Sequence, residues 1–314
     1  MQAENDSLTV MLDAPDDFAG FRQAARVLLA LGAAPELVHW RWSDTLATQA
    51  EDGDLFADAG AAHAAAADAA AADAGAAHTA ADASTDAPAR VITPDALDRL
   101  AIAPGQPVHI RKPQLAVLRH ACCHRNPGRF MLCYRWLWRL QAMPSLAGDA
   151  LDADWREIER LARAVGREIH KMHAFVRFRP AQDEKGAPLH VAWFEPEHHI
   201  VRAASGFFRE RFSNMRWAIL TPDCSVLWDQ ECLQWGPGAT QAQAPGPDAG
   251  EALWLAYYQS TFNPARLKEQ AMLREMPRRY WKNLPETQLI SGLVTGARSR
   301  TGLMLAAQPA AERA

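Results

Sequence analysis

The sequence predicts an α+β fold in which an antiparallel sheet packs against flanking helices. Two observations predict it. Apolar residues recur at helical spacing through residues 154–172, whereas from Ala174 to Arg179 the side chains alternate between two faces, as in a strand. The following segments then read as a second strand, a helix and two further strands. A ββαββ core with helical N- and C-terminal parts is therefore expected.

The chain begins with an expected N-terminal helical segment, residues 1–48. Phe21, Leu28 and Leu31 recur at helical spacing, Gly32 is expected to end this helix, and Pro35 to start a short turn. Residues 49–90 follow as an Ala- and Asp-rich stretch with almost no large apolar side chain to bury. We expect this stretch to be a flexible insertion.

Charge is distributed unevenly along the chain. The formal net charge is −4, from 33 basic and 37 acidic residues, but Glu51 to Ala89 contains eight acids and no Lys or Arg. Without that stretch 33 basic residues face 29 acids, a net charge of +4. A mildly basic remainder favours an anionic partner.

Residues 91–150 are expected to form a basic helical segment. Between Gln106 and Gln141 there are seven Lys or Arg residues and no acid. Two helices joined by a turn at 126–128 fit this stretch. Arg135 and Arg139 are four residues apart, so they should share a helix face.

Residues 151–240 are the expected α+β core, and residues 241–300 a C-terminal helical wrap. Asp154 begins the core helix, whose apolar stripe runs from Trp155 to Met172. Asp248 and Asn263 are expected to start helices of the wrap. Residues 301–314 are expected to be a disordered tail, and 91–300 to form one compact domain with 1–48.

Several classes of protein are disfavoured. Five cysteines in no CxxC spacing favour neither a disulfide framework nor a thiolate metal site. No Walker, strand-borne GxGxxG or GxSxG motif occurs, which disfavours nucleotide hydrolases, dinucleotide enzymes and serine hydrolases. No secretory signal or membrane-length apolar run is present. The expectation is a cytoplasmic protein, with association with the nucleoid left open and no membrane partner.

Histidines gather at two expected element junctions, with acids nearby in sequence. Three uses remain open: a divalent metal site, for which HxxH is a weak signal, proton transfer by a His/Asp pair, and structural capping of helix ends. Proton transfer is favoured slightly over a metal, no cofactor is assigned, and whether the protein is an enzyme stays open. The candidate catalytic residues are His170, His173, His198, His199, Asp223 and Asp229.

Arginine is unusually frequent in the core, and its planar fork matches phosphate geometry. Solvated outward charge is the alternative explanation. In the "RRYWKN" stretch, cations beside aromatic rings suit unstacked bases. For the aromatic residues we favour instead a clamp, in which Tyr280, Trp281 and Leu284 close the core, and the role of the charges stays open. The candidate nucleic-acid-binding residues are Arg135, Arg139, Arg177, Arg179, Arg278, Arg279 and Lys282.

Several long stretches together resemble a bacterial family of proteins assigned to DNA metabolism or DNA repair, whose domain has no known function. The resemblance covers most of the chain outside the Ala/Asp-rich stretch and the tail. It rests on "HRNPGRFMLCYRWLWRL", "HKMHAFVRFR", "AWFEPEHHIVRAASGFFRERFSNMRWAILTPD", "LWD" and "FNPARLKEQAMLREMPRRYWKNLPE".

The resemblance implies which proteins this one acts with, but it implies no catalytic mechanism. Members of the family sit beside a radical-SAM DNA repair or modification protein, or are fused to a uracil-DNA glycosylase-like domain. This chain has neither the radical-SAM cysteines nor the glycosylase motifs. We therefore expect a protein that binds damaged or modified DNA and acts with such a partner. A lyase, glycosylase-like enzyme or metal-dependent nuclease, and a protein-binding scaffold, are the alternatives; lesion, partner and oligomeric state stay open.

Overall fold

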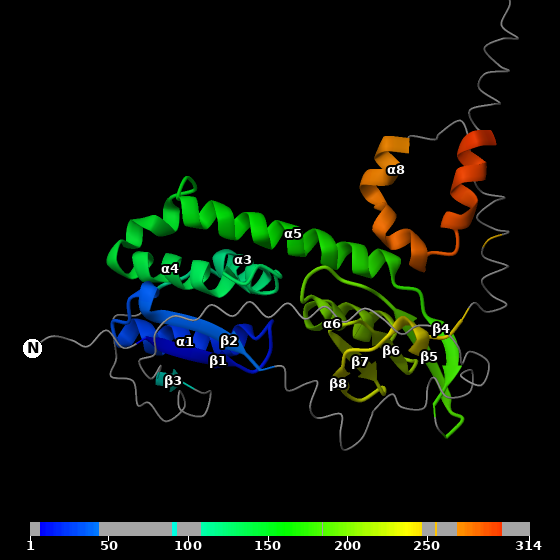
Figure 1. Ribbon diagram of the computed structural model, residues 1–314, viewed down its shortest axis with the longest axis horizontal. Coiled ribbons are helices and arrows are strands. Elements are labelled where there is room, and N and C mark those ends of the chain that lie inside the picture. The colour runs from blue at the N-terminus through cyan, green and yellow to red at the C-terminus, as the bar shows by residue number, and fades with distance from the viewer. Residues whose placement is uncertain are drawn as a thin grey trace, which may run out of the picture.

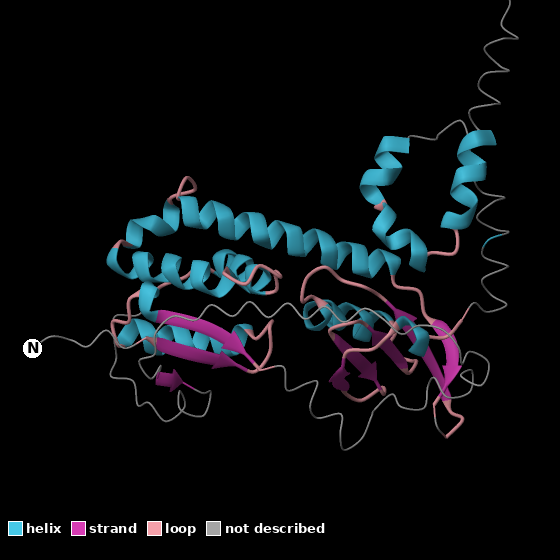
Figure 2. Cartoon of the chain, viewed as in Figure 1, coloured by secondary structure: helices cyan, strands magenta, loops and turns pink. Residues whose placement is uncertain are grey.

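The computed structural model describes residues 7–43, 90–92, 108–183, 185–246, 255 and 269–296. The flexible insertion, apart from Arg90, the tail, and the helix starts expected at Asp248 and Asn263 lie outside these residues. Figure 1 shows two lobes beneath one long helix, α5 (Ala153–Phe175), which runs across both. The expected α+β class is confirmed (Figure 2).

The N-terminal lobe is a parallel three-stranded sheet covered by helices. Its sheet has the order β2-β1-β3, and both pairings are parallel. Its elements are β1 (Leu8–Leu12), α1 (Phe18–Ala30), η1 (Pro35–Leu37), β2 (Val38–Trp42), β3 (Arg90–Ile92), α3 (Lys112–Cys122), α4 (Arg129–Ala142) and η4 (Pro144–Gly148).

The expected helical segment, residues 1–48, contains two strands as well as the predicted helix. The predicted helix exists and ends at Gly32, whose φ of +65° is the left-handed conformation that glycine adopts readily. The strands on either side of it were missed, because five residues are too few for a period-two pattern to stand out against the stronger helical period between them.

The sheet lobe carries a five-stranded sheet of order β4-β5-β6-β7-β8 with α6 packed on it. Three of its four pairings are antiparallel, but β5 and β6 run parallel because α6 connects them. Its elements are β4 (Arg179–Gln182), β5 (Pro188–Trp193), α6 (Val201–Arg211), β6 (Trp217–Leu220), β7 (Cys224–Trp228), β8 (Leu233–Pro237) and η5 (Gln241–Gln243).

Two element boundaries in the sheet lobe differ from the prediction, and one strand was not predicted. α5 continues to Phe175, so the strand starts at Arg179 and not at Ala174. α6 begins at Val201, which leaves 196–200 as a loop. β8 was not predicted, because Leu233–Pro237 contains glycine and proline and lies beside a loop rich in both.

α5 ties the two lobes together because it contributes to both hydrophobic cores. Ile158 and Leu161 are fully buried in the core of the N-terminal lobe. Val165 and Met172, further along the same stripe, are fully buried in the core of the sheet lobe. The apolar stripe predicted from the sequence is therefore a single helix face shared by two cores.

The C-terminal segment, residues 269–296, packs over the end of α5 and the sheet lobe (Figure 1). It contains α8 (Glu269–Glu275), η7 (Arg278–Asn283) and a further helix at 287–296. Tyr280 and Leu284 are buried in the core of the sheet lobe, as expected for the clamp, whereas Trp281 is only partly buried and lines a cleft. Within the described residues no helix is both long enough and apolar enough to span a bilayer.

Candidate functional site

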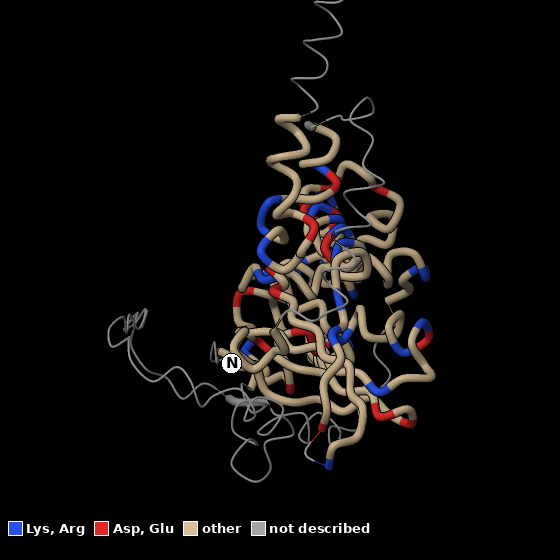
Figure 3. Tube along the Cα trace, turned by 90° about the vertical axis from the view of Figure 1, so that its right-hand side faces the viewer, with Lys and Arg blue, Asp and Glu red and all other residues tan. Residues whose placement is uncertain are grey.

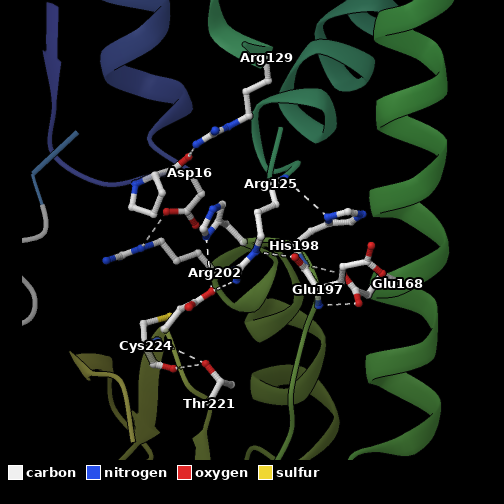
Figure 4. A network of polar contacts seen from close by, with 12 residues as sticks. Asp16, Arg125, Arg129, Glu168, Glu197, His198, Arg202, Thr221 and Cys224 are labelled. Atoms are coloured by element: carbon white, nitrogen blue, oxygen red, sulfur yellow. Dashed lines mark hydrogen bonds and ion pairs between the residues drawn. The ribbon is translucent and has the colours of Figure 1, made fainter. Parts of the chain in front are cut away.

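The two lobes meet where the carboxyl ends of their parallel strands face each other. The loop after β1 carries Asp16, the loop after β5 carries His198 and His199, and the turn after β6 carries Asp223. Figure 4 shows Asp16 and His198 near Glu168 of α5, Arg202 of α6 and Arg125 of the α3–α4 turn. Loops at the carboxyl ends of parallel strands are where α/β folds place ligands.

We call this group the junction cluster. It is defined by residues that bond across the boundary between the two lobes or position those that do. Its members are Asp16, His124, Arg125, Arg129, Glu168, Glu197, His198, His199, Arg202 and Asp223.

Arg125, in the α3–α4 turn, reaches across to the sheet lobe. Its Nε donates to the Glu197 carbonyl oxygen at 2.7 Å, and its Nη2 forms an ion pair with Asp223. Asp223 Oδ2 also lies 3.7 Å from Nδ1 of His199. The backbone N–H of His199 donates to the Cys123 carbonyl oxygen at 2.9 Å. The loop after β5 is thus anchored to the N-terminal lobe.

A second crossing joins the loop after β1 to α6. Asp16 Oδ1 lies 3.5 Å from Arg202 Nε, and the Arg202 guanidinium lies 4.4 Å from the centre of the Trp235 ring. Burial raises the pKa of Asp16, although Arg202 opposes that shift. The fully buried Arg129 donates to the Pro15 carbonyl oxygen and, at 2.8 Å, to that of Cys122.

Glu168 is a buried carboxylate that holds the loop after β5 from the side of α5. It is 2% exposed and accepts the backbone N–H groups of Glu197 and His198 at 2.8 and 2.9 Å. Arg279 Nη2 donates to it at 3.1 Å. Burial raises the pKa of Glu168, and the hydrogen bonds and Arg279 oppose that rise.

The imidazoles of the junction cluster are held neutral. The rings of His124 and His198 are in contact, with their centres 4.1 Å apart and their planes tilted by 31°. Burial is the first cause that lowers each pKa: to about 4 for His124, to about 3 for His199, and in the same direction for His198. Arg129 and Arg125 add to the shift at His199. A base of such low pKa abstracts protons weakly at neutral pH.

The structure brings His198, His199 and Asp223 together but places the other three candidate catalytic residues elsewhere. His173 packs on Phe207 with ring centres 4.1 Å apart, and His170 is exposed on the same helix. Asp229 caps the turn before β8, accepting from the N–H groups of Glu231 and Cys232 at 2.8 Å, which lowers its pKa to about 2. His170, His173 and Asp229 therefore lie outside the site that contains the other three candidates.

No three His, Cys, Asp or Glu side chains in the described parts of the chain are grouped so as to share a metal ion. The divalent metal suggested by the histidines stays an untested expectation.

The candidate nucleic-acid-binding residues divide into three places. Arg135 and Arg139 share a face of α4, as predicted, and both bind Asp154 at the start of α5, at 2.5 and 2.8 Å. Arg139 also binds the N-cap residue Asp152 at 2.6 Å. In this structure they join two helices, and their side chains remain 47% and 42% exposed.

Arg278 and Arg279 belong to η7. The Arg278 guanidinium lies 5.7 Å from the centre of the Trp281 ring. Arg279 binds Glu168 and Glu197 and so continues the junction cluster. The remaining three, Arg177, Arg179 and Lys282, line one cleft.

This cleft, which we call the Arg177 cleft, has a volume of about 610 Å³ and lies between the sheet and the C-terminal segment. Its charged and aromatic lining comes from the loop after α5 and from β4, β5 and η7. Its lining includes the cations Arg177, Arg179 and Lys282, the aromatic residues Trp193 and Trp281, and Asn283.

The cations of the Arg177 cleft are held by nearby oxygens. Arg177 Nη1 donates to the Ala174 carbonyl oxygen at 2.7 Å, at the carboxyl end of α5, and Nη2 lies 3.4 Å from Glu286. Arg179 donates to the Pro245 carbonyl oxygen at 2.9 Å. Lys282 Nζ lies 2.5 Å from Glu195, and its side chain is 54% exposed.

Sequence reasoning missed His124, Arg125, Glu168, Arg202 and Asp16 as site residues. One signal was available for Glu168, which falls between Val165 and Met172 on the buried face of α5. A carboxylate on an apolar stripe indicates a buried polar network. Asp16 and Arg202 carried no such signal, because their meeting depends on how two lobes pack.

Comparison with known proteins identifies a family but no activity. A family model described as a domain of unknown function, DUF4130, matches residues 127–286. No curated protein and no solved structure matches the chain significantly. The matched residues hold α4, α5, the whole five-stranded sheet and most of the Arg177 cleft, and they make up just over half of the chain. This chain belongs to the DUF4130 family.

Proposed function

We propose that this protein binds damaged or modified DNA through the Arg177 cleft, as a DNA-repair or DNA-modification protein. One observation carries the proposal. Three of the cations selected from the sequence for phosphate contact line one cleft with two tryptophans. Cations that track a phosphate backbone beside aromatic rings that stack bases are the common composition of single-stranded nucleic-acid sites.

Two cations of the cleft already pair with carboxylates, so a bound phosphate would compete with these acids. Lys282 and Arg177 are partly exposed; Lys282 forms an ion pair with Glu195, and Arg177 forms one with Glu286. Figure 3 views the molecule from the side of the sheet lobe and shows basic and acidic positions interspersed along the trace. Because no face of a single sign dominates that view, we expect local phosphate contacts and moderate affinity. The chemistry on a lesion would then come from a radical-SAM or glycosylase-type partner.

A catalytic alternative has one specific observation in its favour. His199 and Asp223 lie 3.7 Å apart at the carboxyl ends of parallel strands. A lyase or glycosylase-like reaction would use this pair for proton transfer. Strand cleavage or base release that His199→Gln abolishes would support catalysis over binding alone.

The test is a titration of labelled single-stranded and lesion-bearing DNA followed by fluorescence anisotropy. Affinity should fall steeply between about 50 and 200 mM salt, because bound phosphates release counterions. Lys282→Gln should weaken binding and reduce the salt slope by about one. Arg163→Gln, which removes an exposed cation on the distant part of α5, is the matched control and should bind as the wild type does. Absence of binding at low salt would overturn the proposal and favour a protein-binding scaffold.

A further inference from the structure

We propose that Asn283 reads the base of a nucleotide that has left its stack and entered the Arg177 cleft. This inference rests on the proposed function and adds to it a ligand class and a specificity-determining residue. The ligand is a single unstacked nucleotide, bound by its phosphate, by the face of its base and by the hydrogen-bonding edge of its base.

The first observation is an unsatisfied acceptor. Oδ1 of Asn283 is buried and has no hydrogen-bond partner among the described residues. Asn283 also lines the Arg177 cleft, which none of the other buried, unpartnered side-chain atoms found in the described residues does. A buried polar atom without a partner carries an uncompensated desolvation cost. The terminal torsion of asparagine is soft, so the carboxamide can turn toward a donor that enters the cleft.

The second observation is that the aromatic rings of the cleft are fixed in place. Trp193 Nε1 donates to Glu195 at 2.8 Å, and Trp281 Nε1 donates to the Met276 carbonyl oxygen at 2.9 Å. Because both indole N–H groups are engaged, the rings offer the cleft carbon surface and not donors. Such preorganised rings suit the flat face of a base.

The third observation is that the acceptor and one of the rings belong to the same short element. Asn283 follows Trp281 and Lys282 directly in η7, and all three line the same cleft. One short element therefore supplies a stacking ring, a cation for phosphate and a carboxamide for a base edge. A carboxamide has an acceptor and a donor side by side, which is the pattern that pairs with base edges.

Size and access select the form of the ligand. A volume of about 610 Å³ lies within the range of sites that enclose a small ligand, about 300–1,000 Å³. A base inside a duplex shows only its edge in a groove, so its face cannot reach an indole ring. A base can meet both a ring and a carboxamide only in a single strand or after it has been flipped out.

The experiment compares two single strands of equal length and charge, an oligothymidine and a chain of abasic nucleotides. Wild-type protein should bind the oligothymidine roughly tenfold tighter or more, the contribution of a stacked base. Asn283→Ala should lower that preference about threefold or more, because it removes the hydrogen bond of the carboxamide and leaves the stacking rings in place. Its binding to the abasic chain should stay unchanged. Asn283→Asp, which keeps an acceptor of the same shape, and near-ultraviolet circular dichroism of each variant show whether the segment still folds.

Each outcome bears on one proposal or the other. Equal affinity of wild-type protein for the two strands, or an unchanged preference in folded Asn283→Ala, would overturn the base-reading role and leave phosphate binding intact. Failure of both strands to bind would overturn the proposed function itself. Methylation of thymine at N3 removes the ring donor, so it should lower the affinity of the wild type and leave that of Asn283→Ala unaffected.

Discussion

His199 gives the sharpest stability prediction, because its side chain is 14% exposed and its pKa is lowered from 6.5 to about 3. Its folded-state pKa lies below the unfolded value, so the unfolded chain binds a proton first as the pH falls. Stability should therefore be complete above about pH 6.5 and fall as the pH drops toward the folded pKa. Between pH 7 and pH 5 this one group should cost about 2 kcal/mol.

Urea unfolding at the two pH values measures this cost. His199→Gln, which cannot take up a proton in this range, should lose about 2 kcal/mol less than the wild type between pH 7 and pH 5. His39→Gln makes the same change on the exposed surface of β2 and should keep the wild-type pH dependence. If His199→Gln and the wild type lose the same stability, the neutral, buried state assigned to His199 is wrong.

Three further substitutions test the packing of the site and of the lobes. Glu168→Ala should lower the free energy of unfolding by about 3–5 kcal/mol, since it leaves two backbone N–H groups without their acceptor and removes one of the two carboxylates that bind Arg279. Glu157→Ala, at a partly exposed position, is the control and should change little in the same urea titration. Tyr134→Phe removes the 2.7 Å hydrogen bond to the Ala33 carbonyl oxygen and should cost about 1–2 kcal/mol; an unchanged melting midpoint would contradict that bond. Gly238→Ala should destabilise the protein by ~1–3 kcal/mol, because the new Cβ would lie 2.0 Å from the Pro222 carbonyl oxygen. Gly148→Ala, whose Cβ meets no described atom within 4 Å, should be neutral, and equal effects of the two substitutions would contradict the close approach of Gly238 to Pro222.

Local patterns predicted the elements whose periodicity extends over many residues. The stripe of α5 is buried except at the partly buried Ile169, and the antiparallel strand pairs of the sheet lobe lie close to where alternation placed them. The α+β class followed from these elements. β1 and β2 were not predicted, because a strand of five residues shows too few alternations of apolar and polar side chains to stand out beside the helix between them.

The junction cluster could not be predicted from local sequence, because it forms where two lobes meet. His170 and His173 looked like a site at i, i+3 spacing, but α6 places Phe207 against His173. His198 and His199 proved to lie in a loop and not in a helix, since α6 starts later than expected. Alternation grouped Arg177 and Arg179 on one strand face, but the strand starts at Arg179 and Arg177 lies in the loop before it. Both side chains line the Arg177 cleft, whose contact with η7 is tertiary and leaves no local signal.

The most direct test of the central claim is the salt-dependent binding of single-stranded DNA to wild-type protein and to Lys282→Gln. The proposed function predicts binding that weakens linearly in a plot of log affinity against log salt, with a slope smaller by about one in the variant. Equal slopes for Lys282→Gln and the wild type, or no binding at the lowest salt, would contradict a DNA-binding role for the Arg177 cleft.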